Sequence, residues 1–465
     1  MVKIQRQKVE GRTGLLLLSR TDLKEPGVVQ LKEMSARMTR SHTRSYGIDQ
    51  PSEAADSKKR KAEKLCVLSD VHQSKSKSHK SMSIAKKVIM EYNTDPYDYQ
   101  DEILIDGVIL MFQHFDLYRK FSIEVETIQI FASKVRSFYN PENLFHNFKH
   151  AWGVLHIAFH ILINGGDQYL LPLDIFAVMV AALCHDIQHP GNNNAFEAAT
   201  SSDLSKVKEG IVGAGILECH HATLTNNLLN AIGSDCDILS GLTDEQCDHF
   251  RRQVGLIILG TDMAKHTSLL TEARAYASCN STARSPKSNN SQKSDISNAI
   301  NHKNGIHKHP AGNTERTILK TNINHSQIAY EDAKPKNVGG VDITDPESRI
   351  SFTRVLVHTA DLGAQTQSTE IALKWMERCY GEFRSQAQRE EILGIVTSPF
   401  LHDLKEDNKT FSAQYSFIEE TVEPLWTALS TFLPSLAFAN DQLVSNKLGY
   451  KRMLDDYLSA HQKGL

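Results

Sequence analysis

The chain has 465 residues, of which 40% are hydrophobic and 23% charged, enough for two or three ordinary domains or one large helical domain with extensions. The net charge of −3 is unevenly distributed, because residues 1–90 hold 20 Lys and Arg against 9 Asp and Glu, whereas the remainder holds 32 against 46. The longest apolar run, residues 175–184, is too short to span a bilayer, so no transmembrane segment is expected. Seven scattered cysteines without a CxxC pair indicate a reducing compartment and predict a cytoplasmic protein.

Residues 1–92 are predicted to be a mostly disordered basic segment. Runs such as "SKKRKAEK" and "HQSKSKSHKSMS" cannot bury enough apolar area to order themselves. The positive charge allows a weak contact with an anionic membrane surface or a regulatory partner. The preferred interpretation is a solvated tail without a partner. No nucleic acid is expected as a partner, because the segment contains no recognisable binding module.

Residues 93–460 are predicted to form a helical domain. Stretches such as "ILIDGVILMFQHF", "HAWGVLHIAFHILI" and "PLDIFAVMVAALCHDI" carry apolar residues at three- and four-residue spacing. The segment 277–341 interrupts this pattern and, being rich in Ser, Asn and Lys, is predicted to be a disordered insertion. Its histidines at 302, 307 and 309 have no rigid scaffold and are not expected to bind metal. The predicted fold class is therefore all-α, with a disordered tail and a long insertion.

Two histidine-containing stretches suggest a metal site. In "NLFHNFKHAWGVLH", His146 and His150 are four residues apart and would share a helix face, while His156 turns away to pack. In "ALCHDIQHPGNNNAF", the adjacent His185 and Asp186 follow an apolar helix, where a buried carboxylate needs a compensating cation. Imidazole and carboxylate are typical metal ligands, although Asp186 capping the next turn is an alternative.

Two more acidic and histidine clusters follow. Glu218 and His221 are three apart in "ILECHHATL", and Asp361 ends an apolar stretch in "VLVHTADLG". Taken singly, Glu218 could be a helix-surface charge and Asp361 a cap. Taken with the first two stretches, they predict side chains from several helices converging on a metal site in a helical core.

The order of these stretches resembles the catalytic domain of class I cyclic nucleotide phosphodiesterases, a branch of the HD-type phosphohydrolases. The matching stretches, between residues 95 and 460, are "FHNFKHA", "HDIQHPGNNNAF", "LECHH", "GTDMAKH", "HTADL" and "AQYSFIEETVEPLW". The family usually has Tyr where Phe145 stands. The resemblance implies a compact multi-helix domain that hydrolyses cAMP, cGMP or both to the 5′-monophosphate and so terminates cyclic-nucleotide signalling.

The resemblance also implies roles for single residues. A first, zinc-like metal would be held by His150, His185, Asp186 and Asp361, with Asp186 bridging to a second ion, Mg²⁺ or Mn²⁺. Waters on the second ion would be held by His189, Glu218, His221 and Thr261. His146 would be the general acid, oriented by Glu218. Two metals sharing a water lower its pKa enough to provide hydroxide, and the departing 3′ oxygen needs the proton that a histidine supplies.

Substrate recognition is expected at Gln414 and Phe417, three residues apart on one helix face. In the family, a glutamine here bonds the purine edge and the aromatic ring stacks on it; a surface Gln over a core Phe is the alternative. Ala364 stands where many relatives carry a base-contacting Asn, which leaves the choice between cAMP and cGMP open.

Two other functions remain as alternatives at this stage. An HD-type phosphohydrolase acting on another nucleotide or phosphate ester would explain the metal ligands, but not the pair Gln414 and Phe417. A catalytically silent regulatory homologue would keep the fold, yet no ligand position has been lost.

Overall fold

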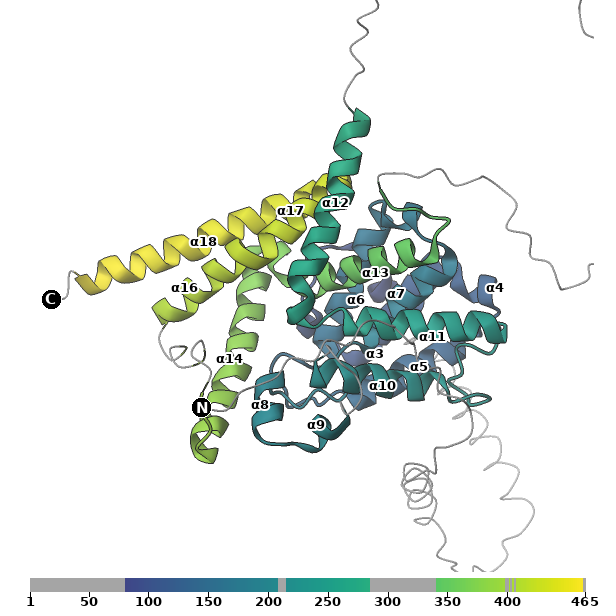
Figure 1. Cartoon of the computed structure of the whole chain (residues 1–465), viewed down its shortest axis with the longest axis horizontal. Coiled ribbons are helices and arrows are strands. Elements are labelled where there is room, and N and C mark those ends of the chain that lie inside the picture. Colours follow the sequence, from purple (N-terminus) through teal and green to yellow (C-terminus); the bar gives the residue numbers. More distant parts are fainter. Residues whose placement is uncertain are drawn as a thin grey trace, which may run out of the picture. The chain divides into compact units, whose positions relative to one another are not determined.

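The structure is a computed structural model that describes residues 80–207, 215–284, 340–397, 401, 404 and 407–462. These residues form helices and short helical turns without a β-strand among them, which confirms the predicted all-α class. After a helix over residues 80–90, the α-helices are α3 (Asp101–His114), α4 (Leu117–Phe121), α5 (Val125–Phe138), α6 (Phe148–Ile163), α7 (Pro172–Cys184), α8 (Asn194–Ala199), α9 (Asp203–Val207), α10 (Ile216–Leu229), α11 (Asp244–Leu259), α12 (His266–Arg284), α13 (Pro346–Asp361), α14 (Thr369–Leu393), α16 (Asp407–Phe417), α17 (Glu423–Phe432) and α18 (Ala437–Gln462) (Figure 1).

Helices α6 and α7 form the centre of this domain, with α11 and α13 packed against them. Thirteen of the 16 residues of α6 and 11 of the 13 residues of α7 are buried. A helix that is apolar on all sides must be covered on all sides, so both helices are held rigidly. His156 packs inside α6, with its ring stacked on Trp152. No helix within the described ranges is long and apolar enough to cross a membrane.

A buried ion pair connects three of these central helices. Asp174 of α7 accepts hydrogen bonds from Arg349 of α13 (2.8 Å) and from Gln253 of α11 (3.0 Å). Asp174 and Arg349 are both buried, so each charge depends on the other. The pair therefore fixes α13 against α7, and with it the helix end at Asp361.

The C-terminal helices form a second group (Figure 1). Helix α16 packs on α18, while α17 packs on both α12 and α18. A single π-helical turn, η5 (Ile418–Val422), joins α16 to α17 without a break in the helix, and Pro424, which has no backbone N–H to donate, follows just after this turn. Helix α14 ends at Gly394, which adopts the left-handed conformation (φ +65°) common after helix ends.

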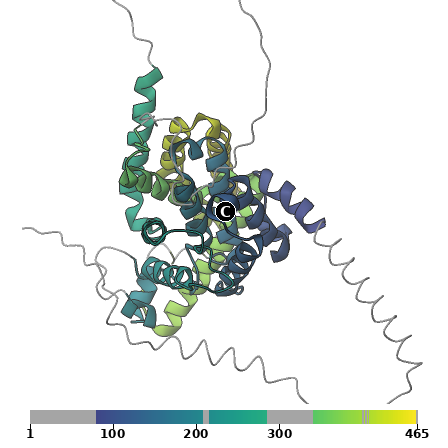
Figure 2. The same cartoon turned by 90° about the vertical axis from the view of Figure 1, so that its right-hand side faces the viewer.

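The helices extend past both predicted borders of disorder. Residues 80–90 are helical although they lie within 1–92, because Ala85, Val88 and Ile89 form a buried stripe among Ser and Lys. Helix α12 runs to Arg284, inside the predicted insertion 277–341, and its last turns project from the other helices in both views (Figures 1 and 2). The remaining residues of the predicted tail and insertion, with the histidines at 302, 307 and 309, lie outside the described residues.

Candidate active site

The turn before α6 presents two of the predicted site histidines. The Oδ1 atom of Asn147 accepts hydrogen bonds from the backbone N–H groups of Lys149 (2.9 Å) and His150 (3.4 Å) and so caps the helix. Helix α6 therefore begins at Phe148, with His150 in its first turn. His146 lies before the helix, so the prediction of a shared helix face was wrong. The two rings are nevertheless neighbours, with centroids 5.8 Å apart.

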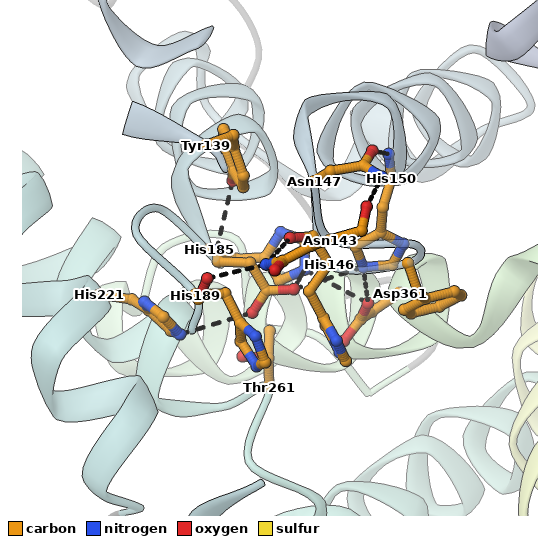
Figure 3. Close-up of polar contacts among 12 residues, drawn as sticks. Tyr139, Asn143, His146, Asn147, His150, His185, His189, His221, Thr261 and Asp361 are labelled. Carbon is orange, nitrogen blue, oxygen red and sulfur yellow. Dashed lines mark hydrogen bonds and ion pairs between the residues drawn. The ribbon is translucent and has the colours of Figure 1, made fainter. Parts of the chain in front are cut away.

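The end of α7 places His185 and Asp186 beside each other. His185 donates from Nδ1 to a carbonyl of the last turn of α7 (2.9 Å), which leaves its Nε2 facing the site. The hydroxyl of Tyr139 accepts from the backbone N–H of Asp186 (3.3 Å) and donates to another carbonyl of α7 (2.9 Å). Figure 3 shows Tyr139 in this position. The chain after α7 is thereby held so that the Asp186 carboxylate faces imidazoles.

Four side chains from three parts of the chain converge at this point. The Nε2 atom of His150 lies 3.1 Å from Asp361 Oδ1 and 3.5 Å from Asp186 Oδ2. The Nε2 atom of His185 lies 3.1 Å from Asp186 Oδ2 and 3.3 Å from Asp361 Oδ1 (Figure 3). The structure thus brings together all four residues predicted to hold the first metal.

The chemistry of this cluster fits a divalent metal. The Nε2 atoms of His185 and His221 are buried and face carboxylate oxygens without making a well-aligned hydrogen bond, while the Nδ1 atom of each is bonded to a backbone carbonyl. A metal would satisfy these nitrogens, and carbonyl bonds at the opposite nitrogen are the usual support of metal-binding histidines. Burial raises the pKa of Asp186 and Asp361, but the contacts with His185 and His150 together hold both values below the usual range, so positive charge beside these carboxylates keeps them ionised. The site therefore offers ionised carboxylates and imidazole nitrogens.

Asp186 also belongs to a second group that could hold an ion, together with His189 and His221. The Nε2 atom of His221 lies 3.7 Å from Asp186 Oδ1, whereas Oδ2 of the same carboxylate faces His150 and His185. The two oxygens of Asp186 thus face different groups of imidazoles. This is the arrangement that a carboxylate bridging two metal ions requires.

The partner of His146 differs from the predicted one. Its Nδ1 is hydrogen-bonded to Oε1 of Glu382 on α14, not to Glu218. Burial lowers the pKa of His146, but the Glu382 carboxylate outweighs this effect and the net pKa lies above its ordinary value. Glu218 instead accepts hydrogen bonds from Asn194 (3.0 Å to Oε2), and burial raises its pKa to about 7.

Asn143 joins the two loops that carry His146 and His189. Its Nδ2 donates to the backbone carbonyls of both histidines, at 2.8 Å each. The two imidazole rings are stacked, with centroids 3.9 Å apart (Figure 3). Gly191 follows with φ +75°, and a Cβ atom there would lie 2.9 Å from Asn143 Oδ1, so this turn requires glycine.

A cavity of about 380 Å³ is lined by the two carboxylates of the first group, Asp186 and Asp361, and by His189 and His221 of the second. Its volume suits a small-molecule substrate. Nδ1 of His146 is occupied by Glu382, so Nε2 is the nitrogen left to serve this cavity. The predicted site residues that line it are His146, Asp186, His189, Glu218, His221, Thr261 and Asp361.

The predicted base-binding residues lie apart from this cavity. Gln414 is buried on α16 and Phe417, at the end of that helix, is 36% exposed, and neither lines the cavity. Ala364 borders a small recess together with His150 and Asp361. Recognition of a base by these residues stays a prediction.

The residues that orient the site were missed from the sequence. Glu382 lies on a helix 21 positions after Asp361, Tyr139 precedes the histidine stretch, and Asn143 is the first residue of that stretch. A signal for Glu382 did exist, because Glu382, Gln386 and Glu390 repeat every four residues and all three are buried. A buried polar stripe on an otherwise amphipathic helix indicates partners inside the protein.

Two phosphodiesterases are among the known proteins that this chain resembles. The chain is 26% identical over 371 residues to the 3′,5′-cyclic-nucleotide phosphodiesterase regA of Dictyostelium discoideum, covering 80% of this chain and 38% of the relative. It is 26% identical to the 3′,5′-cyclic-AMP phosphodiesterase 4C of Mus musculus, covering 74% and 42%. The chain thus spans about two fifths of the length of these two relatives.

A solved structure has the same fold. The phosphodiesterase domain of the Salpingoeca rosetta rhodopsin phosphodiesterase superposes with a TM-score of 0.63 at 23% identity, covering 83% of this chain and 98% of that domain. The family model described as 3′5′-cyclic nucleotide phosphodiesterase matches residues 145–443, which run from the His146 turn into α18 and include every predicted site residue. The chain therefore belongs to the 3′5′-cyclic nucleotide phosphodiesterase family.

Proposed function

We propose that this chain hydrolyses 3′,5′-cyclic nucleotides, cAMP, cGMP or both, to nucleoside 5′-monophosphates. The observation that carries the proposal is the convergence of His150, His185, Asp186 and Asp361 beneath a cavity that His146 also lines. Metal cations that activate water and a separate proton donor for the leaving oxygen are one established way to hydrolyse a phosphodiester. Membership of the phosphodiesterase family supports the same activity.

The proposed first metal is zinc, held by His150, His185, Asp186 and Asp361. Two imidazole nitrogens and two carboxylate oxygens form a donor set that suits Zn²⁺. The proposed second ion is Mg²⁺ or Mn²⁺, which Asp186 would share and which prefers oxygen ligands and retained water. When bound, such ions supply an activated water and neutralise charge on the phosphoryl oxygens.

Polar groups around the proposed site of the second ion have a proposed role in holding its water molecules. His189, Glu218, His221 and Thr261 line the same cavity as Asp186. The hydroxyl of Thr261 donates to the carbonyl of Ile258 (2.8 Å), which leaves its oxygen lone pairs as acceptors for water. Acceptors and imidazoles on several sides would fix the orientation of waters there.

His146 is the proposed general acid. Its bond to Glu382 raises its pKa and so favours the protonated ring, and its Nε2, which is not the nitrogen bonded to Glu382, would serve the cavity. A protonated imidazole there would donate a proton to the departing 3′ oxygen, which is a poor leaving group as an alkoxide. Gln414 and Phe417 are proposed to bind the base.

The purified chain, assayed with Zn²⁺ and Mg²⁺ present, tests this function. We expect cAMP or cGMP to be converted to the 5′-monophosphate. A phosphohydrolase of the alternative kind would instead release phosphate from nucleoside monophosphates. In Asp186→Ala, turnover should vanish and bound metal measured by elemental analysis should fall sharply. A folded, metal-loaded protein that leaves both cyclic nucleotides intact would show that the proposed activity is wrong.

The cysteine pattern of the sequence supports a proposed cytoplasmic location. The basic N-terminal segment supports a proposed peripheral contact with an anionic membrane. Cosedimentation with vesicles that contain or lack anionic lipid tests the second proposal. Binding only to the anionic vesicles, lost when residues 1–79 are removed, is the expected result.

A further inference from the structure

Tyr97 lies outside the cavity but contacts both ends of the turn that presents His146. Its hydroxyl donates a hydrogen bond to the backbone carbonyl of Leu144 (3.1 Å). The same hydroxyl accepts one from Nδ2 of Asn147 (2.7 Å). Since His146 lies between Leu144 and Asn147, one oxygen atom holds the chain on either side of it.

This turn depends on side chains for its conformation. Among residues 144–147, the backbone–backbone hydrogen bond found within the turn is that from Asn147 N–H to the Phe145 carbonyl (2.8 Å). The other restraints come from Asn143, which binds the His146 carbonyl, and from Glu382, which accepts from the His146 N–H (3.1 Å). A turn with so little internal bonding takes its position from the groups around it.

Tyr97 is in turn fixed to α14, the helix that carries Glu382. The guanidinium carbon of Arg378 lies 3.6 Å from the centroid of the Tyr97 ring. Arg378 also pairs with Asp95 (3.3 Å), whose carboxylate accepts from the backbone N–H of Tyr97 (3.0 Å). Arg378 and Glu382 are four residues apart and share one face of α14. Tyr97 therefore connects the His146 turn to the part of α14 that holds the partner of His146.

A lysine of α6 strengthens this connection from the other side. Lys149 donates to the backbone carbonyls of Pro96 (2.9 Å) and Tyr99 (2.7 Å), on both sides of Tyr97. Burial raises the pKa of Tyr97, so its hydroxyl stays neutral and can both donate and accept at physiological pH. The segment 95–99 is thus bonded to α6 and to α14 at once.

We propose that Tyr97 is a positioning residue for proton donation, which sets the His146 turn against α14 so that His146 reaches Glu382. The inference rests on the proposed function, because it assigns the proton donor of that reaction. The hydroxyl of Tyr97, and not its ring alone, carries this role. The hydroxyl is the atom that contacts the turn, whereas the ring contacts α14.

Tyr97→Phe tests the proposal, because it removes the hydroxyl and keeps the ring. We expect kcat to fall roughly tenfold, the factor that corresponds to one hydrogen bond of ordinary net strength, with KM and metal content unchanged. A cyclic nucleotide with sulfur in place of the bridging 3′ oxygen should recover most of the lost rate, because a thiolate departs without protonation. Tyr118→Phe is the matched control. The Tyr118 hydroxyl also donates to a backbone carbonyl (Ile109, 3.0 Å), but this bond joins α4 to α3 and does not involve the His146 turn.

A second readout does not depend on activity. The Nδ1 proton shared by His146 and Glu382 should give a downfield proton NMR signal, identified by its loss in His146→Ala. We expect this signal to broaden or vanish in Tyr97→Phe and to persist in Tyr118→Phe. If wild-type protein hydrolyses neither nucleotide, the proposed function fails, while the NMR comparison still decides the role of Tyr97.

Arg378→Lys is a further variant, because it keeps the charge beside Asp95 but loses the planar group under the Tyr97 ring. Arg378→Lys should also lower kcat, but by a smaller factor than Tyr97→Phe does. The inference is overturned if Tyr97→Phe keeps the wild-type kcat and signal. A rate loss that the sulfur substrate does not restore, or one accompanied by metal loss, overturns it equally.

Discussion

Glu382 holds His146 through both of its carboxylate oxygens. One oxygen is bonded to Nδ1 of the imidazole, and the other accepts the backbone N–H groups of Phe145 (2.9 Å) and His146 (3.1 Å). One residue from a distant helix therefore orients His146 through both its imidazole ring and its backbone. Burial raises the pKa of Glu382, but His146 outweighs this and holds the pKa below its usual value, so the carboxylate stays ionised.

Replacing this carboxylate should lower the rate and shift its pH dependence. In Glu382→Gln, kcat should fall roughly 10- to 100-fold, the cost typical of removing the carboxylate partner of a functional histidine. His146 donates as the protonated ring, so the rate declines as pH rises through its pKa. Without the negative charge that pKa falls, and the decline in kcat should begin at lower pH.

Glu218→Gln provides the contrast in the same pH–rate measurement. Glu218 is bonded to Asn194 and not to His146, so the position of the alkaline decline should match that of wild type. If Glu218→Gln moves the decline and Glu382→Gln does not, the orienting residue has been misassigned.

His146 and His150 should differ in what their replacement by alanine removes. His146→Ala should keep its metals and near-normal substrate affinity while turnover falls about 10²–10⁴-fold, the usual contribution of general acid catalysis. His150→Ala should lose metal as well as rate, because its Nε2 faces both Asp186 and Asp361. Metal analysis and steady-state kinetics of both variants measure this difference.

A substrate with an activated 3′ leaving group sharpens the comparison. It should restore much of the rate in His146→Ala and little in His150→Ala, because such a group departs without a proton. Equal restoration in both variants, or metal loss from both, would mean that the roles of the two histidines are divided wrongly.

Most of the predicted insertion should be removable. The chain returns at Gly340, where a Cβ atom would lie 2.9 Å from Cys279 Sγ, so residue 340 packs directly on α12. Val341 is buried and Arg349 is anchored on Asp174, and both contacts fix the start of α13 without the insertion. A variant with residues 281–338 replaced by a short Gly/Ser linker should keep kcat within about twofold, because loop-closure entropy changes slowly with loop length.

Metal content and the thermal unfolding midpoint of this deletion variant serve as its controls. A well-folded, metal-loaded variant with a large fall in kcat would show that the insertion is a functional part of the site.

The ion pair between Asp174 and Arg349 should be important for stability. Asp174→Ala leaves the Arg349 guanidinium buried without its partner, which should lower the free energy of unfolding by about 3–5 kcal/mol. The double variant Asp174→Ala with Arg349→Met should recover part of this loss. Denaturant unfolding measures both, and Arg119→Ala, in an exposed ion pair, should leave the midpoint unchanged. A midpoint for Asp174→Ala equal to that of wild type would show that the pair does not hold α13 in place.

Local patterns in the sequence determined the helical class and singled out histidines and aspartates that the structure brings together, whose binding of metal stays a prediction. Apolar spacing of three and four residues predicts α6 and α7, because a helix buries whichever stripe repeats at that period. The pairing of His185 with Asp186 at the end of an apolar helix carries its own chemical signal, since a buried carboxylate needs a cation. The order of the short motifs then indicated the family, which the family model and the relatives confirmed.

Tertiary structure decided which groups orient the candidate site residues. Glu382, which contacts His146, lies 236 positions after it, and Tyr97, which contacts Leu144, lies 47 positions before it. No local spacing in the sequence predicts contacts between residues so far apart. The helix start at Phe148, set by the cap at Asn147, also moved His146 out of the helix that the spacing predicted. Candidate ligand residues can be read from the sequence because their chemical type is unusual in a core. The residues that orient them are ordinary Glu, Asn and Tyr side chains, whose roles arise only from the packing of α14, α6 and the segment 95–99.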